Sequence, residues 1–442
     1  MMDSNKLEKI TSWAKRRGFI FPSSEIYGGI GGVYDFGPYG VRLKNNIKRL
    51  WWKTVVEERE DIVGIESSIL MNRAVWQASG HEKGFTDELV ECKKCHQRFK
   101  ADDVPEGKCL SGGEHELTEP KKFNGMFQTF VGVTQNEEAK TYLRPETAQG
   151  MFTDFKQVLE TSRKKIPFGI AQMGKCFRNE INTKDYLFRV REFEIAEVEY
   201  FVKPGTDEKA FENAFEYWKT FIIGLGIKEE NLVNYEHPKK DLSHYSKRTV
   251  DIQYKFPFGT KELAGVANRT DFDLKAHMEN SGKDLDYFDP ELNEKYVPYV
   301  IEPTVGIERL MLAVICDAFE EVKPRTETTE ATTENEIILH FKPSIAPIKI
   351  AVLPLVKKLS KEAREIYNDL KKCWPDIEFD ESGSIGRRYR RQDEIGTPYC
   401  VTIDFDTIEK DQSVTVRDRD SMKQERIKVS DLKSHLFEKL DF

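Results

Sequence analysis

KCFRNEINTKDYLFRVREFEIAEVEYFV, residues 175–202, predicts the central element of the fold. Two apolar runs in and around this stretch flank a polar loop at 181–187. If 170–180 is one strand and 191–202 is its antiparallel partner, alternate side chains of each strand point to the same face. One face of this hairpin then carries Arg178, Glu180, Phe193, Glu197 and Glu199.

Charged side chains inside apolar strands carry a free-energy cost unless they are paired or bind a polar ligand. For a single strand carboxylate, an exposed sheet face with salt bridges is the ordinary interpretation. Five polar or aromatic residues clustered on two neighbouring strands instead favour a ligand site. Arginine clamps phosphate through paired donors, a phenylalanine ring can stack on a base, and a carboxylate accepts from an exocyclic amine. The cluster therefore predicts a site for ATP in a bent conformation with its α-phosphate exposed.

A second stretch, VIEPTVGIERLML at 300–312, reads as a strand that runs into a helix. Glu302, Thr304 and Gly306 alternate to one face of that strand, and glycine allows a ligand or backbone to approach closely. Arg309 falls in the first turn of the helix, where its guanidinium can point back over the sheet. Taken alone, Arg309 would be read as an ordinary exposed helix arginine.

Composition places the chain among ordinary globular proteins. Its 442 residues suggest two to four domains, with 39% hydrophobic and 33% charged residues. No apolar run approaches the roughly 20 residues that span a bilayer, and the N-terminus lacks a signal-peptide core. The seven cysteines are odd in number and mostly scattered, which indicates reduced thiols and a cytoplasmic location. With a net charge of −8, nucleic acid could bind only at a local basic patch.

The order of the predicted elements suggests two domains, 1–335 and 336–442, with insertions at about 86–122 and 227–298. The composition break TETTEATTENE at 326–336 reads as a linker. After it, strand, helix and strand patterns alternate, which argues for a small α/β domain. The helices expected from apolar periodicity or strand–helix order are 6–17, 41–57, 206–226, 307–320 and 357–372, and the strands expected in the last domain are 349–355 and 399–405.

The first insertion contains a candidate metal site. Cys92 and Cys95 are spaced like half of a zinc knuckle, and Cys109 follows. His115 or His96 could supply a fourth ligand, which would make a structural Zn²⁺ site. The alternative is a relic loop with free thiols.

An arginine cluster in the C-terminal domain is the candidate nucleic-acid contact. SIGRRYRRQ, 384–392, places Arg387, Arg388, Arg390 and Arg391 around a tyrosine. Such a charge run is usually a solvated face. In an acidic protein it is the best candidate for contact with an RNA backbone or anticodon.

The motifs resemble those of class II aminoacyl-tRNA synthetases. FRNE at 177–180 with REF at 191–193 resembles motif 2, GIER at 306–309 resembles motif 3, and the helix at 41–57 resembles motif 1. The match is closer still to the homodimeric glycyl-tRNA synthetases. The stretches that carry it are YDFGPYG (34–40), GHEKGFTDELVECKKC (80–95), LRPETAQGMF (143–152), FRNEI (177–181), FRVREFEIAEVEYF (188–201), ELAGVANRTDFDL (262–274), EPTVGIERL (302–310) and SIAPIKIAVLPL (344–355).

This resemblance implies fold, activity and partners together. The expected fold is α/β, with a mixed, mostly antiparallel six-stranded sheet and helices, then a five-stranded α/β anticodon-binding domain. The implied activity is ATP-dependent attachment of glycine to its tRNA through glycyl-adenylate, with Mg²⁺, in a homodimer without membrane contact. Related synthetases often carry a fuller cysteine set in the insertion, so this chain departs from the family at the proposed zinc site.

The resemblance also implies roles for individual residues. Arg178 and Arg309 are expected to be catalytic: Arg178 grips the α-phosphate, and Arg309 covers adenine and reaches the γ-phosphate. The expected ATP-binding residues are Arg178, Asn179, Glu180, Phe188, Arg189, Val190, Arg191, Glu192, Phe193, Glu262, Leu263, Gly306, Ile307, Glu308 and Arg309. The expected glycine-binding residues are Arg98, Glu146, Phe193, Glu194, Ile195, Ala196, Glu197, Arg269, Glu302, Pro303, Thr304, Val305 and Gly306.

Two other functions compete with this interpretation. A non-catalytic relative, acting as a nucleic-acid-binding accessory subunit, would be expected to lose Arg178, Glu180 or Arg309, and this chain keeps all three. A class II synthetase for threonine or proline is disfavoured by the segments ETAQG and ANRTDFDL, which favour glycine. Threonine stands at 304, where the family often has serine, and its added methyl narrows the pocket.

Overall fold

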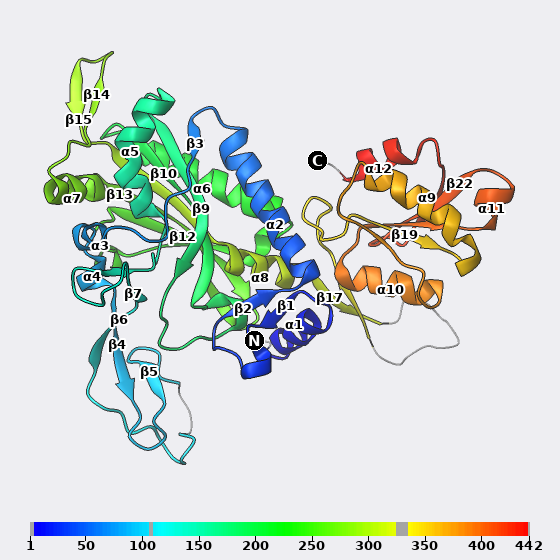
Figure 1. Ribbon diagram of the computed structural model, residues 1–442, viewed down its shortest axis with the longest axis horizontal. Helices are drawn as coiled ribbons and strands as arrows, with labels where there is room; N and C mark the ends of the chain where they lie inside the picture. The colour runs from blue at the N-terminus through cyan, green and yellow to red at the C-terminus, as the bar shows by residue number, and fades with distance from the viewer. Residues whose placement is uncertain (1–3, 106–108, 324–334, 441–442) are drawn as a thin grey trace.

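The computed structural model describes residues 4–105, 109–323 and 335–440. Its N-terminal body is built around a seven-stranded sheet and its C-terminal module around a five-stranded sheet (Figure 1). The linker expected at 326–336 lies, up to residue 334, outside the described residues. Within the described part of the chain, no helix is long and apolar enough to cross a membrane.

The large sheet is mixed and mostly antiparallel, as the sequence predicts. Its strands in spatial order are β11 (Leu232–Glu236), β12 (Arg248–Phe256), β13 (Gly259–Thr270), β16 (Tyr299–Gly306), β10 (Glu192–Val202), β9 (Phe168–Phe177) and β3 (Ile62–Gly64). Within it, β3 and β9 run parallel and the other neighbours are antiparallel. The sheet has one strand more than expected. Its edge strand β11 is mostly exposed, so its sequence carries little apolar alternation.

The predicted hairpin is the centre of this sheet. Strands β9 and β10 pair with Phe193 opposite Cys176 and Glu197 opposite Gln172. The first strand ends at Phe177, so Arg178 lies one residue beyond it rather than inside it. Its backbone N–H still donates to the Arg191 oxygen at 2.9 Å, which continues the pairing by one bond. Arg178 therefore stands where the hairpin opens.

Helices cover both faces of the sheet. The front face, which carries Glu197 and Phe201, packs against α5 (Ala148–Ser162) and α7 (Phe272–Ser281). The back face, which carries Ala196 and Val198, packs in one large apolar cluster. The helices of that cluster are α1 (Ser4–Arg16), α2 (Pro38–Trp52), which continues as a π-helical turn at Lys53–Glu57, α6 (Asp207–Gly224) and α8 (Ile307–Ala318). The expected helices at 6–17, 41–57, 206–226 and 307–320 correspond to these.

Residues 227–298 are not a separate insertion, contrary to the sequence-based expectation. They supply β11, β12 and β13, three neighbouring strands of the large sheet. Burial is concentrated in β12 and β13, where Val250, Ile252 and Val266 join the main core. The charged loops between these strands hid their apolar runs. Only the short hairpin of β14 (Tyr287–Asp289) and β15 (Glu294–Tyr296) stands apart at one end of the body (Figure 1).

The first insertion forms a small sheet that projects from the body (Figure 1). Its strand order is β5 (Arg98–Lys100), β4 (Thr86–Glu91) and β6 (Lys121–Asn124). The remaining short elements of the body are β1 (Ile20–Pro22), β2 (Tyr34–Phe36), α3 (Arg73–Ala78), α4 (His81–Gly84), β7 (Gln128–Phe130), β8 (Lys140–Tyr142), β17 (Phe319–Val322) and β18 (Glu336–Leu339).

The C-terminal module has the predicted α/β pattern. Its sheet order is β20 (Ile377–Phe379), β19 (Ile350–Pro354), β21 (Tyr399–Ile403), β22 (Ser413–Asp418) and β23 (Gln424–Lys428). The first three strands are parallel, and the last two add antiparallel edges. Its helices are α9 (Ser360–Lys371), α10 (Ile385–Ile395), α11 (Phe405–Glu409) and α12 (Leu432–Leu440). Strand β18 pairs back with β17, so the expected boundary at 335/336 falls within a connecting hairpin.

Candidate active site

A cavity of about 530 Å³ opens on the front of the large sheet. Strands β10, β13 and β16 form its floor, and the loop after β9 and the start of α8 form part of its wall. The sequence-predicted residues that line it are Glu146, Arg178, Asn179, Glu180, Phe188, Arg189, Val190, Phe193, Ile195, Glu197, Glu262, Leu263, Glu302, Thr304, Val305, Gly306, Glu308 and Arg309. Two separate stretches of sequence, around 178–197 and 302–309, therefore meet in one cavity.

Arg178 lies between two aromatic rings at this cavity. Its Cζ is 5.5 Å from the ring centroid of Phe193 and 5.5 Å from that of Phe85. Its Nε donates to the Pro145 backbone oxygen at 3.1 Å. The ring contacts and this bond restrict the side chain, and no acidic residue in the described part of the chain forms an ion pair with it. A guanidinium held in this way is suited to receiving a phosphate.

Arg309 lines the same cavity from the first turn of α8. Its Nη1 lies 3.3 Å from the Glu262 carboxylate and donates to the Glu262 backbone oxygen at 3.1 Å. Its Cζ stands 4.3 Å above the Phe188 ring, a cation–π contact. Glu262 is half-exposed, so this ion pair is a weak restraint that an incoming nucleotide can replace.

A buried acidic niche adjoins the two arginines. Glu197 accepts from the Thr304 hydroxyl at 3.0 Å and from the Thr147 backbone N–H at 3.0 Å, and also from the Thr147 hydroxyl. Burial raises the pKa of Glu197, and the neighbouring Glu146 charge raises it further. The three hydrogen bonds oppose that shift because they stabilise the ionised carboxylate.

Glu146 stands at the α5 side of the niche. Its carboxylate lies 3.2 Å from His81 Nε2 and accepts from Gln149 at 3.0 Å. Burial opposes its ionisation, but His81 and Arg269 outweigh burial and hold the pKa of this carboxyl well below its usual range. His81 and Arg269 therefore favour the ionised form of Glu146.

The floor of the niche is an ion-paired cluster. Arg269 donates to Asp273 at 2.8 Å through both Nε and Nη2, and it also pairs with Glu302. Burial raises the pKa of Glu302, and the nearby Glu197 and Glu146 charges raise it further, whereas its ion pair with Arg269 favours the ionised carboxylate. The niche thus gathers more carboxyl groups than cations, which suits a small cationic ligand.

Some predicted residues do not line the cavity. They are Arg98, Arg191, Glu192, Glu194, Ala196, Arg269, Pro303 and Ile307. Arg98 is exposed on the insertion and pairs with Glu91 at 3.0 Å. Arg191 donates to the backbone oxygens of Gly31 at 2.7 Å and Glu180 at 2.9 Å, so it braces the loop after β9. Arg269 lies directly beneath the lining, through its pair with Glu302.

The others belong to the body around the cavity. Glu192 pairs with Lys175 at 2.7 Å and Glu194 with Lys48 at 2.8 Å. Two predicted residues are core side chains, Ala196 and Ile307. Pro303 points to the back of the sheet because neighbouring strand residues alternate between faces.

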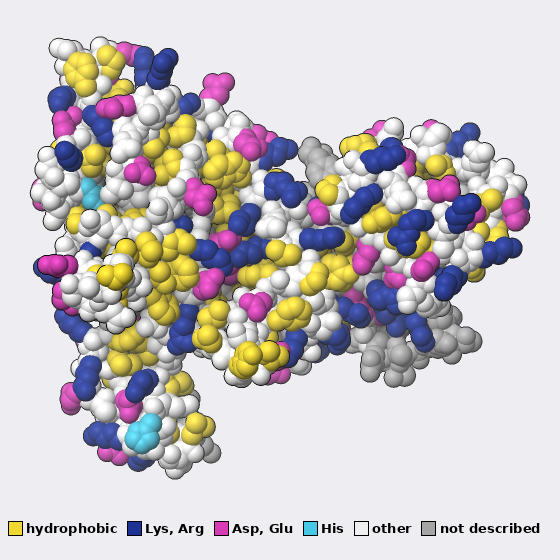
Figure 2. Space-filling model, viewed as in Figure 1, with side chains coloured by type: hydrophobic (Ala, Val, Ile, Leu, Met, Phe, Trp, Pro, Cys, Tyr) yellow, Lys and Arg dark blue, Asp and Glu magenta, His cyan; other side chains and the backbone are white. Residues whose placement is uncertain are grey.

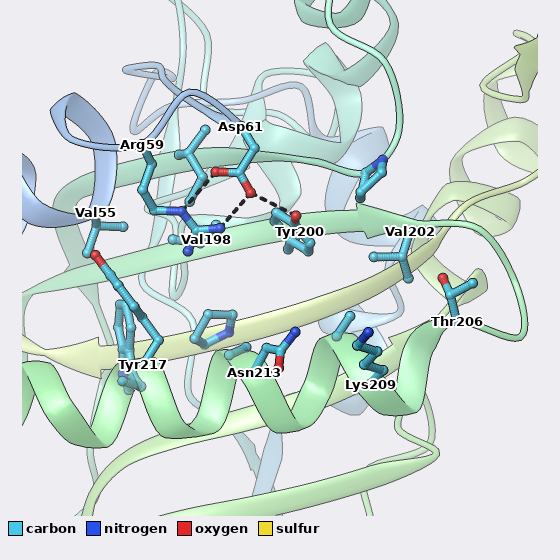
Figure 3. Close-up of a pocket in the computed structure, with 16 residues that line it drawn as sticks. Val55, Arg59, Asp61, Val198, Tyr200, Val202, Thr206, Lys209, Asn213 and Tyr217 are labelled. Carbon is cyan, nitrogen blue, oxygen red and sulfur yellow. Dashed lines mark hydrogen bonds and ion pairs between the residues drawn. The ribbon is translucent and has the colours of Figure 1, made fainter.

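Pro303 lines a second cavity of about 430 Å³, between α6 and the back of the sheet (Figure 3). There Asp61 accepts from Arg59 at 2.9 Å and from the Tyr200 hydroxyl at 2.8 Å. Tyr217 reaches across from α6 (Figure 3). This cavity is separated from the acidic niche by the thickness of the sheet.

Several lining residues escaped sequence reasoning. They are Phe85, Asp87, Lys100, Gly125, Leu187, Ser243, Tyr245, Thr249, Asp251, Ala264, Gly265, Val266 and Ala267. Lys100 and Asp87 come from the insertion, which brings charged groups back over the cavity mouth. Tyr245 lies in a charged loop, and its ring stacks on the Arg269 guanidinium. The Cζ atom of Arg269 is 3.9 Å from the ring centroid of Tyr245. Nothing in a single irregular loop signals such a contact, although alternation along β13 could have suggested its front-face residues.

The four predicted metal ligands come together in the insertion. The ligand atoms of Cys92, Cys95, Cys109 and His115 all lie within 4.8 Å of one another. Cys92 Sγ is 3.7 Å from Cys109 Sγ, and Cys95 Sγ is 3.8 Å from His115 Nδ1. A tetrahedral zinc site with Zn–S bonds of about 2.3 Å spaces its sulfurs about 3.8 Å apart. The donor set and spacing therefore fit Zn²⁺.

The C-terminal arginine cluster is divided between surface and interior. Arg388 is 2% exposed and donates to the backbone oxygens of Asp380 and Leu355 at 3.3 and 3.2 Å. The expectation that Arg388 contacts RNA at the surface is therefore wrong, because its side chain is buried. Arg391 pairs with Asp380 at 2.6 Å, and Arg390 pairs with Glu336 at 2.8 Å. Arg387 is exposed. On the face seen in Figure 2, basic side chains are interspersed with acidic ones over this module.

Comparison with known proteins identifies both halves of the chain. Residues 129–318 match the family model of the tRNA synthetase class II core domain (G, H, P, S and T), and residues 349–439 match that of the anticodon binding domain. Similar proteins include three that carry the name glycine–tRNA ligase. The protein of Caldanaerobacter subterraneus subsp. tengcongensis is 52% identical over 99% of both chains. That of Clostridium acetobutylicum is 51% identical over 100% of both. That of Thermobifida fusca is 50% identical over 99% of this chain and 98% of its own.

This chain and these three relatives share about half of their residues over nearly their full lengths. The two matched family models also follow the order of the two modules in the structure. The chain therefore belongs to the glycine–tRNA ligase family of class II tRNA synthetases.

Proposed function

We propose that this chain activates glycine with ATP and transfers it to tRNA, in two steps that share the front cavity. The observation that carries the proposal is the meeting of Arg178 and Arg309 in one cavity beside a buried acidic niche. Phosphate-binding groups and ammonium-binding groups thus stand next to each other, as a reaction between an amino acid and ATP requires.

In the first step, a glycine carboxylate oxygen attacks the α-phosphorus of ATP and pyrophosphate leaves. Arg178 binds the α-phosphate and the attacking carboxylate, and it neutralises the charge that develops between them. Arg309 covers adenine and reaches the γ-phosphate, which holds ATP in its bent form. When bound, Mg²⁺ neutralises phosphate charge, and the half-exposed Glu262 is the residue that would hold it.

Adenine lies between the hairpin and α8 in this proposal. Phe193 stacks on the base, and Glu180 accepts from its amino group. Burial raises the pKa of Glu180 while the Arg178 charge lowers it, so nucleotide binding and the protonation of Glu180 are coupled.

Glycine is held by the niche. Glu146, Glu197 and Glu302 face the α-ammonium, and Arg269 holds Glu302 in place through its ion pair. The hydroxyl of Thr304 is bonded to Glu197, and its added methyl would narrow the space for a larger amino-acid side chain. Exclusion by crowded polar groups is stronger than the roughly 1–3 kcal/mol that one methyl provides in an apolar pocket.

In the second step, the 3′-terminal ribose hydroxyl of tRNA attacks the glycyl carbonyl and AMP leaves. The adenylate phosphate takes the proton, so no separate protein base is required. The C-terminal module binds the anticodon, and Arg387 is the member of the arginine cluster best exposed for RNA contact. A homodimer formed through α2 and a cytoplasmic location complete the proposal.

Zn²⁺ is part of the proposal as a structural ion. It would hold Cys92, Cys95, Cys109 and His115 and would fix the insertion that carries Lys100 to the cavity mouth. Related synthetases often carry more cysteines in this insertion, so the presence of zinc in this chain needs its own test. Metal analysis of the purified protein supplies it.

Charging of tRNA with labelled glycine tests the whole function. Purified protein with ATP and Mg²⁺ should form acid-precipitable glycyl-tRNA. Arg178→Ala should abolish both charging and glycine-dependent ATP–pyrophosphate exchange, whereas Arg387→Ala should weaken charging and retain exchange. Protein that binds tRNA without either activity would instead support the accessory-subunit function.

A further inference from the structure

Glu199 is the one member of the hairpin's polar face that the proposed mechanism leaves unused. It stands on β10 two residues after Glu197 and is 0% exposed. Among the described residues, neither of its carboxyl oxygens has a hydrogen-bond partner. An ionised carboxylate in that position would carry a large desolvation cost with nothing to offset it.

The register of the sheet places Glu199 next to the glycine niche. Strands β10 and β16 pair with Glu197 opposite Thr304 and Tyr200 opposite Ile301, so Glu199 stands opposite Glu302. Directly opposed residues share a face, with their Cβ atoms about 4.5–5.5 Å apart. On the β16 side, Glu302 is therefore the residue directly opposite Glu199.

Glu302 already has a cationic partner. Arg269 pairs with Glu302 and, at 2.8 Å, with Asp273, so its guanidinium is divided between two carboxylates. A further negative charge at Glu199 would compete with Glu302 for the same cation. Two adjacent buried carboxylates favour a state in which one of them keeps its proton.

The surrounding charges determine which carboxyl keeps it. Burial raises the pKa of Glu199 well above its usual value, and the Glu302 charge raises it further. Arg269 lowers it, while Glu197 and Asp273 raise it again. Glu302 has a direct ion pair with Arg269, whereas Glu199 has no donor among the described residues, so Glu199 is the carboxyl more suited to keep the proton.

We propose that Glu199 is a positioning residue that remains a neutral carboxylic acid and donates its hydroxyl hydrogen to the Glu302 carboxylate. Glu302 then keeps its charge and its orientation toward Arg269 and toward the ammonium group of glycine. This inference rests on the proposed function, because it assigns Glu199 a role in amino-acid binding. A leucine here would fill the space but would leave Glu302 without that donor.

Infrared difference spectroscopy tests the protonation state without any assay of activity. The carbonyl stretch of a protonated carboxyl differs from the stretches of a carboxylate. The spectrum of the wild-type chain minus that of Glu199→Gln, at neutral pH, should show the loss of one protonated-acid band. Loss of carboxylate bands instead would overturn the proposal.

Glycine kinetics test the positioning role. Glu199→Ala should raise KM for glycine by about tenfold or more and change kcat much less, because it removes a donor to a binding carboxylate. Glu199→Gln keeps a neutral donor of similar size and should recover most of that loss. The matched control is Glu216→Ala on the exposed side of α6, which should leave KM for glycine unchanged.

The possible results distinguish a failure of this inference from a failure of the proposed function. Wild-type protein without glycine-dependent exchange would refute the proposed function, whatever the spectra show. Normal wild-type exchange with Glu199→Gln as damaging as Glu199→Ala would mean that the charge of Glu199 is needed, and would overturn the inference alone. If Glu199→Ala does not fold, the spectrum of Glu199→Gln still decides.

Discussion

Thr304→Val removes one hydroxyl from the niche and keeps the shape of the side chain. That hydroxyl donates to Glu197 Oε1 at 3.0 Å, while the other Glu197 oxygen is served by Thr147. The substitution leaves one buried carboxylate oxygen without its donor. Trp218 donates to the backbone oxygen of Thr304 at 3.2 Å, so the strand position itself is unaffected.

The size of the effect follows from the charge of the acceptor. A hydrogen bond to a charged group contributes about 1.5–3 kcal/mol, which corresponds to about 10- to 150-fold in KM for glycine. Burial already raises the pKa of Glu197, and loss of the donor raises it further. At pH values below that pKa the carboxyl is neutral and attracts the glycine ammonium less. The loss should therefore be largest at pH values between the pKa of Glu197 in the wild-type chain and its higher pKa in Thr304→Val, and it should shrink at pH values above both.

Glycine-dependent ATP–pyrophosphate exchange measures this effect. KM for glycine and for ATP should be determined from about pH 6 to 8.5 for the wild-type chain, Thr304→Val and Thr304→Ser. Thr304→Ser keeps the hydroxyl and should stay close to wild type. Glycine binding by Thr304→Val that equals wild-type binding at every pH from about 6 to 8.5 would contradict the role of this hydroxyl.

Three further substitutions probe other parts of the structure. Cys109→Ser should reduce bound zinc from about one ion per chain toward zero, measured by elemental analysis, because a four-ligand site loses one thiolate; unchanged zinc content would contradict the site. Arg309→Ala should lower glycine-dependent exchange by about 10²–10³-fold through lost charge stabilisation, and activity within threefold of wild type would rule out its catalytic role. Gly40→Ala should lower the free energy of unfolding by about 1–3 kcal/mol in denaturant, because a Cβ there would lie 1.8 Å from the Phe19 backbone oxygen. The control is Gly84→Ala, whose Cβ meets nothing within 4 Å and which should leave the free energy of unfolding unchanged.

The parts of the fold that the sequence predicts are those whose periodicity is uninterrupted. The β9–β10 hairpin and the passage from β16 into α8 follow directly from alternation and apolar spacing. Because these elements carry most of the polar residues around the cavity, the lining at Arg178, Glu197 and Arg309 was predictable as well. In these strands the alternation of residues along the chain also determines which side chains face the cavity.

Where tertiary contacts override local pattern, the sequence is a poor guide. Residues 227–298 were expected to form an insertion because charged loops separate their strands, yet β12 and β13 lie inside the sheet. Arg388 lies in a basic run, which predicts a surface position, but its guanidinium donates to the backbone oxygens of Pro354, Leu355 and Asp380 in the interior. A charge run does not reveal which of its members the helix turns inward.

The cavity mouth could not be predicted for a related reason. Lys100 reaches it from β5 of the insertion, and Phe85 reaches it from the residue between α4 and β4. Long-range packing sets the positions of both elements against the large sheet. The fold class and the two modules were nevertheless expected correctly, because the resemblance spans nearly the whole chain rather than a single motif.

Amino-acid-dependent ATP–pyrophosphate exchange with glycine, alanine, serine, threonine and proline measures directly whether this cavity selects glycine. A cavity that joins two phosphate-binding arginines to a cramped acidic niche should give strong exchange with glycine and kcat/KM at least about 100-fold lower with each of the others. Exchange with alanine or serine that approaches the glycine value, or no exchange with any amino acid, would contradict the account.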